Sequence, residues 1–178
     1  MVLNLAFAVA GIVAALAGFV AARPSRFRIV RTATMRAPAA AVFAQINDFR
    51  HWQAWSPWAR RGPAMKQTYE GAAAGAGAVY TWEGNKEVGK GRMTLVESRA
   101  GERITIAMEF FAPFAATATT EFTFTPRGDG TEVTWAMSGT RNFVAKGLDM
   151  VMNMDRMVGG DFEKGLASMK SIVEGDRP

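Results

Sequence analysis

The stretch FVAKGLDMVMNMDRMVGGDFEKGLASMKSIV, residues 143–173, decides the fold of this chain. Its mostly apolar positions recur at alternating steps of three and four residues, and they are Leu148, Val151, Asp155, Val158, Phe162, Gly165, Met169 and Ile172. This spacing predicts one long helix with an apolar face. A helix with so large an apolar face needs a partner surface in water. We therefore expect the preceding residues to supply that surface.

The preceding residues contain seven segments in which apolar and polar side chains alternate. The segments are 26–35, 65–70, 79–83, 88–97, 103–110, 116–125 and 132–138. In 103–110, for example, Ile104 and Ile106 are expected on one face of the strand and Thr105 on the other. Turn residues such as Gly84-Asn85 separate the segments. The pattern is typical of an antiparallel sheet with one face in water. The sequence therefore predicts an α+β fold, a curved antiparallel sheet of about seven strands wrapped on the C-terminal helix.

Two short helices are expected between the first two strands. Residues 39–47 follow Pro38, a residue suited to the first turn of a helix. Asp48 is expected to cap a second short helix, which carries Trp52 and Trp55. We expect this second helix to end at Ser56-Pro57.

The N-terminal segment is apolar, and Asn4 is the only polar side chain between Val2 and Ala22. Its length matches the roughly 20 residues that a helix needs to cross a bilayer. A cleaved signal peptide is the alternative, but no basic residue precedes the apolar run. We predict that residues 1–23 form a transmembrane anchor or uncleaved signal, and that 24–178 form one ligand-binding domain.

Basic residues follow this segment directly, and those nearest to it are Arg23, Arg26 and Arg28. Basic residues in this position contact anionic lipid headgroups and favour the cytoplasmic side. We therefore expect a single-pass protein of the inner or plasma membrane, with its domain in the cytoplasm. The net charge of +5 does not predict a nucleic-acid partner, because the motifs of such proteins are missing from the sequence.

Composition excludes several kinds of chemistry. The chain has no cysteine and one histidine. Disulfides, thiolate nucleophiles and multi-histidine metal sites therefore cannot be assembled. We predict no metal and no cofactor.

Three residues are weak candidates for proton transfer, and none is assigned as catalytic. His51 lies beside Trp52 in a short polar helix, where an exposed or capping role is the ordinary explanation. Tyr80 lies in an expected strand. Asp155 interrupts the apolar helix face and is expected to cap the helix, to pair with an arginine such as Arg141 or Arg156, or to make a buried polar contact.

Large aromatic and sulfur-containing residues fall on or near the predicted inner side of the sheet and helix. Each could be plain core, but together they suit an adaptable apolar cavity. The predicted ligand-binding residues are Trp52, Trp55, Trp82, Met93, Met108, Phe110, Trp135, Met137, Met154 and Phe162. Glycines 147, 159, 160 and 165 either bend the closing helix or allow its close contact with the sheet.

Three motif groups together resemble a known superfamily. They are Asp48-x-x-x-Trp52-x-x-Trp55-Ser56-Pro57-Trp58, Gly75-x-Gly77 before Tyr80-x-Trp82-x-Gly84-Asn85, and Gly130-Thr131-x-Val133-x-Trp135 with the later Val158-Gly159-x-Asp161-Phe162-Glu163. Residues 27–174 resemble the SRPBCC superfamily of START and Bet v 1-like proteins, which includes polyketide cyclases/dehydrases and lipid-transport proteins. The chain resembles in particular the membrane-tethered bacterial members. This resemblance implies the helix-grip fold and a ligand cavity, but no single reaction.

These observations favour a membrane-anchored binding or carrier module for a lipid-like or polycyclic apolar small molecule. The cavity would lie between the sheet and the C-terminal helix. One alternative is a metal-free polyketide cyclase/dehydratase-like enzyme. The other is an interaction module without a cavity.

Overall fold

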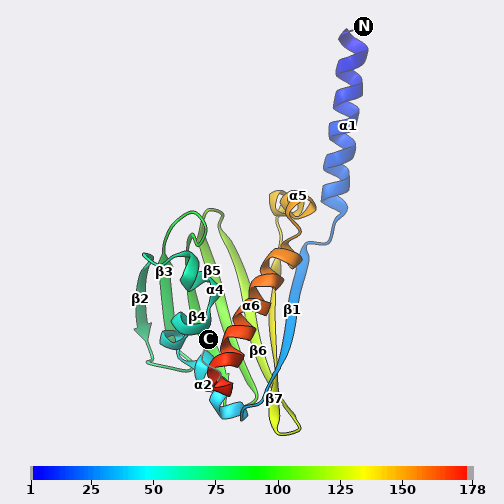
Figure 1. Cartoon of the computed structure of the whole chain (residues 1–178). Helices are drawn as coiled ribbons and strands as arrows, with labels where there is room; N and C mark the ends of the chain where they lie inside the picture. Colours follow the sequence, from blue (N-terminus) through cyan, green and yellow to red (C-terminus); the bar gives the residue numbers. More distant parts are fainter. Residues whose placement is uncertain (1, 176–178) are drawn as a thin grey trace.

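The computed structural model describes residues 2–175, and for residues 2, 3, 5, 6 and 8 it describes the backbone alone. Figure 1 shows a curved sheet, helices against one of its faces, and a separate N-terminal helix. The helices are α1 (Val2–Ala22), α2 (Ala39–Asn47), the 3-10 helix η1 (Phe49–His51), α3 (Trp52–Trp55), α4 (Pro57–Arg61), α5 (Phe143–Met152) and α6 (Met154–Glu174). The strands are β1 (Arg26–Met35), β2 (Lys66–Gly71), β3 (Ala78–Glu83), β4 (Lys90–Arg99), β5 (Arg103–Ala112), β6 (Ala116–Arg127) and β7 (Gly130–Thr140).

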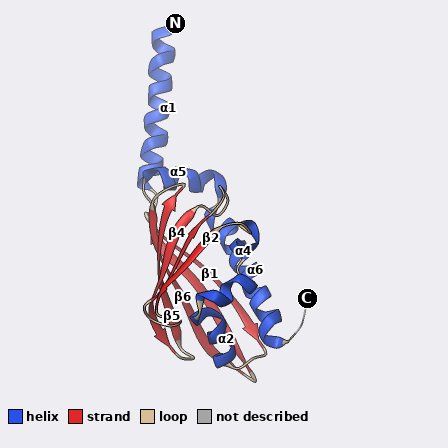
Figure 2. Ribbon diagram, turned by 90° about the vertical axis from the view of Figure 1, so that its left-hand side faces the viewer, coloured by secondary structure: helices blue, strands red, loops and turns tan. Residues whose placement is uncertain are grey.

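The seven strands form one antiparallel sheet in the order β1-β7-β6-β5-β4-β3-β2. The first strand therefore pairs with the last, and Ile29 lies opposite Met137. Helices α2, α4 and α6 cover one face, which we call the inner face (Figure 2). The predicted α+β fold, with a seven-stranded antiparallel sheet and a C-terminal helix on it, is confirmed.

The short helices differ in one respect from the prediction. Asp48 caps η1 as expected, because its carboxylate accepts the backbone N–H of Arg50 at 2.9 Å. The helix that carries Trp52 and Trp55 ends at Ser56 as predicted, but a further helix that was not predicted, α4, begins at Pro57. Proline is tolerated at this position, since the first N–H of a helix has no partner within the helix.

The C-terminal region consists of two helices, and the prediction of one continuous helix over 143–173 was wrong. Asn153 separates them with a left-handed backbone conformation, φ 44°. Its side chain also accepts the backbone N–H of Arg156 and so begins α6. Asparagine adopts this conformation more easily than other residues with side chains. Because the chain turns here, Leu148 and Val151 leave the predicted apolar face and are 39% and 87% exposed.

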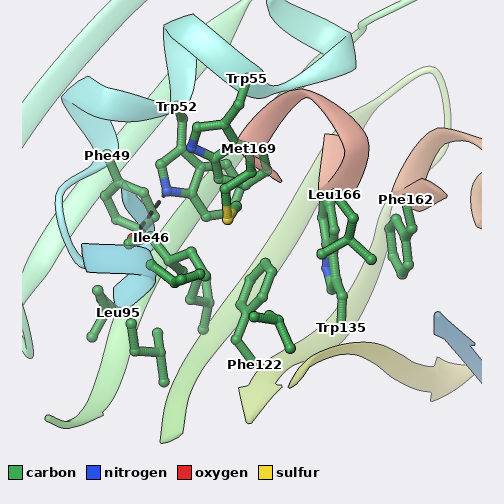
Figure 3. Packing of buried hydrophobic residues seen from close by; sticks show 14 of the residues in the cluster. Ile46, Phe49, Trp52, Trp55, Leu95, Phe122, Trp135, Phe162, Leu166 and Met169 are labelled. Carbon is green, nitrogen blue, oxygen red and sulfur yellow. Dashed lines mark hydrogen bonds between the residues drawn. The ribbon is translucent and has the colours of Figure 1, made fainter. Parts of the chain in front are cut away.

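The second part of the predicted apolar face does pack on the sheet. Phe162, Leu166 and Met169 of α6 are buried. They meet aromatic side chains from α3, β6 and β7 in the core (Figure 3). Within this core, the indole N–H of Trp52 donates to the carbonyl of Ile46 at 3.0 Å.

Helix α1 stands apart from the sheet and its covering helices (Figure 1). Its exposed large apolar side chains are Phe7, Val9, Ile12, Val13, Leu16 and Phe19. Across the part of the chain that the structure describes, no helix combines the length and the hydropathy needed to cross a membrane. The predicted transmembrane segment over 1–23 includes side chains outside that part, those of residues 1–3, 5, 6 and 8.

Candidate ligand-binding surface

The ten residues predicted to bind a ligand fall into two groups. One group is buried, with at most 8% of each side chain exposed, and contains Trp52, Trp55, Trp82, Met93, Trp135 and Phe162. The other group is half-buried and contains Met108, Phe110, Met137 and Met154. The two groups are neighbours in the sheet, since the buried Met93 pairs with the half-buried Met108 and the ring of the buried Trp82 lies 6.0 Å from that of Phe110.

The buried aromatic residues contact one another. The rings of Trp135 and Phe162 are stacked, with centroids 4.0 Å apart and planes at 7°. Trp55 meets Trp135 edge-on at 5.6 Å, and Trp52 lies 4.6 Å from Trp55. These rings from α3, β7 and α6 therefore fill the interior where the three elements meet (Figure 3).

Small residues lie on the inner face beside the half-buried group. Met108 of β5 pairs across the sheet with Ala118 of β6, which pairs in turn with Gly139 of β7. The aromatic ring of Phe27 covers Gly139, because a Cβ added at that glycine would lie 2.8 Å from the ring. We call Met108, Phe110, Met137 and Ala118 the inner rim. It is an apolar surface that the helices cover only in part.

One polar atom is buried near this surface without a partner. Among the described side chains, only Arg103 Nε and Trp135 Nε1 are buried and lack a hydrogen-bond partner. A buried N–H group without an acceptor costs free energy. The indole N–H of Trp135 therefore lies without an acceptor among the packed rings of the core.

A hollow of about 310 Å³ lies across β5, β6 and β7. Most of its lining residues alternate onto the outer face, opposite the helices, and these are Ala107, Glu109, Thr117, Thr119, Ser138 and Thr140. It is an open depression, and Met108, Ala118 and Gly139 of the inner face also line it. It therefore differs from the predicted cavity, which was expected to lie between the sheet and the C-terminal helix.

The three weak catalytic candidates have different partners and do not form one site. His51 is exposed, and its Nδ1 lies 2.9 Å from the carbonyl oxygen of Ala44. Asp155 is exposed and pairs with Arg31 at 3.2 Å. Tyr80 alone lies in the interior, where burial raises its hydroxyl pKa to about 12. A phenol with this pKa stays protonated near neutral pH and can serve there as a hydrogen-bond donor.

The ionic contacts of α6 were not predicted. Arg31 of β1 binds both Asp155 and Glu163 of α6, with its Nε 2.6 Å from Glu163 Oε1. Pairing with an arginine was one of the three roles expected for Asp155, but the partner is Arg31 and not Arg141, which pairs with Asp149. Hydrogen bonds to Asp155 and then to Glu163 raise the pKa of Arg31 above its ordinary value. Asp155 therefore binds Arg31 from a distant strand and not an arginine close to it in the sequence.

A second ionic contact ties α4 to α6. Asp161 is 4% exposed, and both of its oxygens accept hydrogen bonds from Arg61. These hydrogen bonds raise the pKa of Arg61. The sequence offered one signal, a charged residue next to Phe162 on the buried side of a helix. Arg61 could not be identified as its partner from spacing, since one hundred residues separate the two.

Comparison with known proteins places this geometry in a class. The fold is similar to the solved structure of the KanY protein, with 21% identity, a TM-score of 0.63, and coverage of 84% of this chain and 99% of that one. It is similar to the di-domain ARO/CYC StfQ from the steffimycin biosynthetic pathway, with 14% identity, a TM-score of 0.63, and coverage of 85% of this chain and 51% of that one. Protein CV1439 from Chromobacterium violaceum is 18% identical, with a TM-score of 0.58 and coverage of 85% and 99%. These likenesses show that the chain shares the fold of these proteins.

The family follows from the sequence itself. A family profile described as "Polyketide cyclase / dehydrase and lipid transport" matches residues 26–174. The chain belongs to this family. A search of curated proteins gave no match.

Proposed function

We propose that this protein is a membrane-anchored binding or carrier module for a lipid-like or polycyclic apolar small molecule. The observation that carries the proposal is the inner rim, where apolar side chains on the inner face stay half-exposed beside a closed aromatic core. Apolar surface with few polar groups is typical of small-molecule sites.

Two features support the proposed anchor. Apart from Asn4, the exposed side chains of α1 that the structure describes are apolar, and they include Ile12 and Leu16. Arg23, Arg26 and Arg28 follow the helix and are exposed, as expected for contact with anionic headgroups. An anchor would hold the domain where apolar ligands partition, with the domain on the cytoplasmic side.

A binding role needs no group that transfers a proton, and this favours it over a cyclase/dehydratase-like enzyme. Tyr80 holds its proton near neutral pH, and His51 is exposed away from the inner rim. An interaction module without a ligand is the remaining alternative. It predicts that no apolar molecule binds saturably.

The test uses the full chain in lipid nanodiscs and 9,10-dibromostearate, a fatty acid that quenches tryptophan fluorescence. The chain has five tryptophans, and four of them are in the predicted ligand-binding set. Quenching that saturates at one fatty acid per protein is expected. Mass spectrometry of lipids extracted from the purified protein should also find an enriched apolar compound. Quenching that rises without saturation, together with empty protein, would exclude the binding role.

A further inference from the structure

Helix α5 has its polar and apolar sides reversed relative to a helix that packs on a core. None of its ten residues is buried. Its large apolar side chains are exposed, and these are Phe143, Val144, Leu148, Met150, Val151 and Met152. The exposed fraction reaches 87% at Val151. A helix of a soluble domain normally places this face against the protein.

The polar side chains of α5 are turned toward the rest of the protein instead. Asp149 pairs with Arg141 at 3.2 Å, and these side chains are only 21% and 19% exposed. The same carboxylate accepts the backbone N–H of Met154 at 3.0 Å. Lys146 donates to the carbonyl of Ala21 at 3.1 Å, so it binds the C-terminal end of α1. These contacts fix which side of α5 faces outward.

Other exposed apolar residues lie at the same end of the molecule. Phe111 and Phe114, at the β5–β6 turn, are 44% and 66% exposed. The pairing register places this turn beside the start of β1 and the end of β7, since β6 begins next to the final residues of β7. Figure 1 shows α5 beside the point where α1 leaves the domain, and Figure 2 shows the same arrangement from a second direction.

We propose that α5 and the β5–β6 turn together form a docking surface that lies on a lipid bilayer. This inference rests on the proposed anchor, because α1 would enter the same bilayer beside α5. Continuity with the exposed apolar side chains of α1 favours lipid over a protein partner. The exposed Arg23 and Arg26 would lie at the headgroup level, where anionic lipids attract them. An amphipathic helix in this position lies in the interface with its apolar face toward the acyl chains.

Docking would also set the direction in which the ligand site faces. The inner rim lies at the α5 end of the sheet, so a docked domain would present it toward the membrane. A lipid-like molecule could then pass between bilayer and rim without crossing much water.

The experiment uses the full chain in vesicles of phosphatidylcholine and phosphatidylglycerol. Because the chain has no cysteine, single labels can be placed with Val151→Cys on α5, Leu16→Cys on α1 and Asp129→Cys on the β6–β7 turn. Each cysteine carries an environment-sensitive dye, and nitroxide-labelled lipids quench dyes that lie near the acyl chains. We expect severalfold stronger quenching at Val151→Cys and Leu16→Cys than at Asp129→Cys. Adding Val144→Glu and Leu148→Glu should abolish quenching at residue 151 and leave residue 16 unchanged.

The other outcomes overturn the inference in distinguishable ways. If residue 16 is quenched and residue 151 behaves like residue 129, the anchor stands and α5 does not dock. If residues 16 and 151 both escape quenching, the anchor and the docking surface fail together. Disulfide formation between copies of Val151→Cys without quenching would mean that a second copy covers α5. Fatty-acid binding is measured separately, so the loss of that function would leave these results intact.

Discussion

The guanidinium group of Arg31 on β1 occupies the space that a side chain at Gly159 of α6 would need. Glycine at this position therefore lets the arginine reach Asp155 on one side and Glu163 on the other. Two ion pairs and a missing side chain together set where α6 crosses the edge of the sheet. Gly165 has a similar role farther along, since a Cβ there would lie 2.9 Å from the ring of Trp135. These two glycines serve close packing of the helix on the sheet.

Gly159→Ala should destabilise the protein, because Arg31 must give up its ion pairs to make room. In an Arg31→Ala background the same substitution should stabilise it by about 1 kcal/mol, since alanine favours helix over glycine. The coupling between the two positions should be about 1–2 kcal/mol in chemical denaturation. Gly160→Ala is the matched control, because open space surrounds it, and it should stabilise both backgrounds. Equal effects of Gly159→Ala and Gly160→Ala on stability would show that the ion pairs of Arg31 do not require glycine at position 159.

Phe162→Ala should lower the free energy of unfolding by about 3–5 kcal/mol, as expected when a buried aromatic side chain leaves a cavity. The loss follows from its position, stacked on Trp135 and 1% exposed. Urea denaturation followed by tryptophan fluorescence measures it. Phe114→Ala serves as the control, because a phenylalanine that is 66% exposed should change stability by less than about 0.5 kcal/mol. A small effect at residue 162 would mean that α6 contributes little to the core.

Glu174 should make the free energy of unfolding depend on pH in the acidic range. Its carboxylate accepts the backbone N–H of Arg36 at 2.6 Å, and this hydrogen bond lowers its pKa below the ordinary value of 4.5. A carboxylate whose pKa is lower in the folded state stabilises the protein at pH values above its pKa in the unfolded chain. This contribution is lost as the pH falls through its pKa in the folded protein. Wild-type protein should therefore lose stability below about pH 4.5 more steeply than Glu174→Gln.

The matched control for this pH dependence is Glu70→Gln, which removes an exposed carboxylate from β2. Its stability should follow the wild-type curve through the same pH range. Parallel curves for wild type and Glu174→Gln would show that the bond to Arg36 does not persist in solution.

Ala118→Leu should weaken saturable binding of dibromostearate at least tenfold, because the larger side chain fills the inner rim between Met108 and Gly139. Thr119→Leu is the control, since the next residue of β6 faces the outer hollow. Tryptophan quenching in nanodiscs measures both, with circular dichroism to confirm folding. The reverse result, with binding lost only in Thr119→Leu, would place the ligand in the outer hollow.

The sequence predicted much of the fold because its patterns are local. Strand β1 has the predicted bounds, and alternation in β5 correctly placed Ile104 and Ile106 on the buried face. The helix break at Asn153 was missed because apolar residues continue in step on both sides of it. The spacing of apolar residues gives no sign that Asn153 adopts a left-handed backbone conformation.

The site was less predictable than the fold. Alternation placed the candidate residues on or near the inner side, but it could not separate those that pack against one another from those that stay accessible. Trp135 and Met137 lie two residues apart on the same face, yet one is buried under Phe162 and the other is half-buried at the rim.

By itself, the sequence determined the alternation of seven strands, the apolar face of α6 and the chemistry that a chain without cysteine cannot perform. Those features depend on residues close together in the chain. The repeat of a helix or a strand decides which of their side chains lie on the same face. Only the tertiary structure decided that Arg31 pairs with Asp155, that Arg61 pairs with Asp161 and that the apolar face of α5 remains outside. These contacts join residues far apart in the chain, and their geometry exists only after the helices have packed on the sheet.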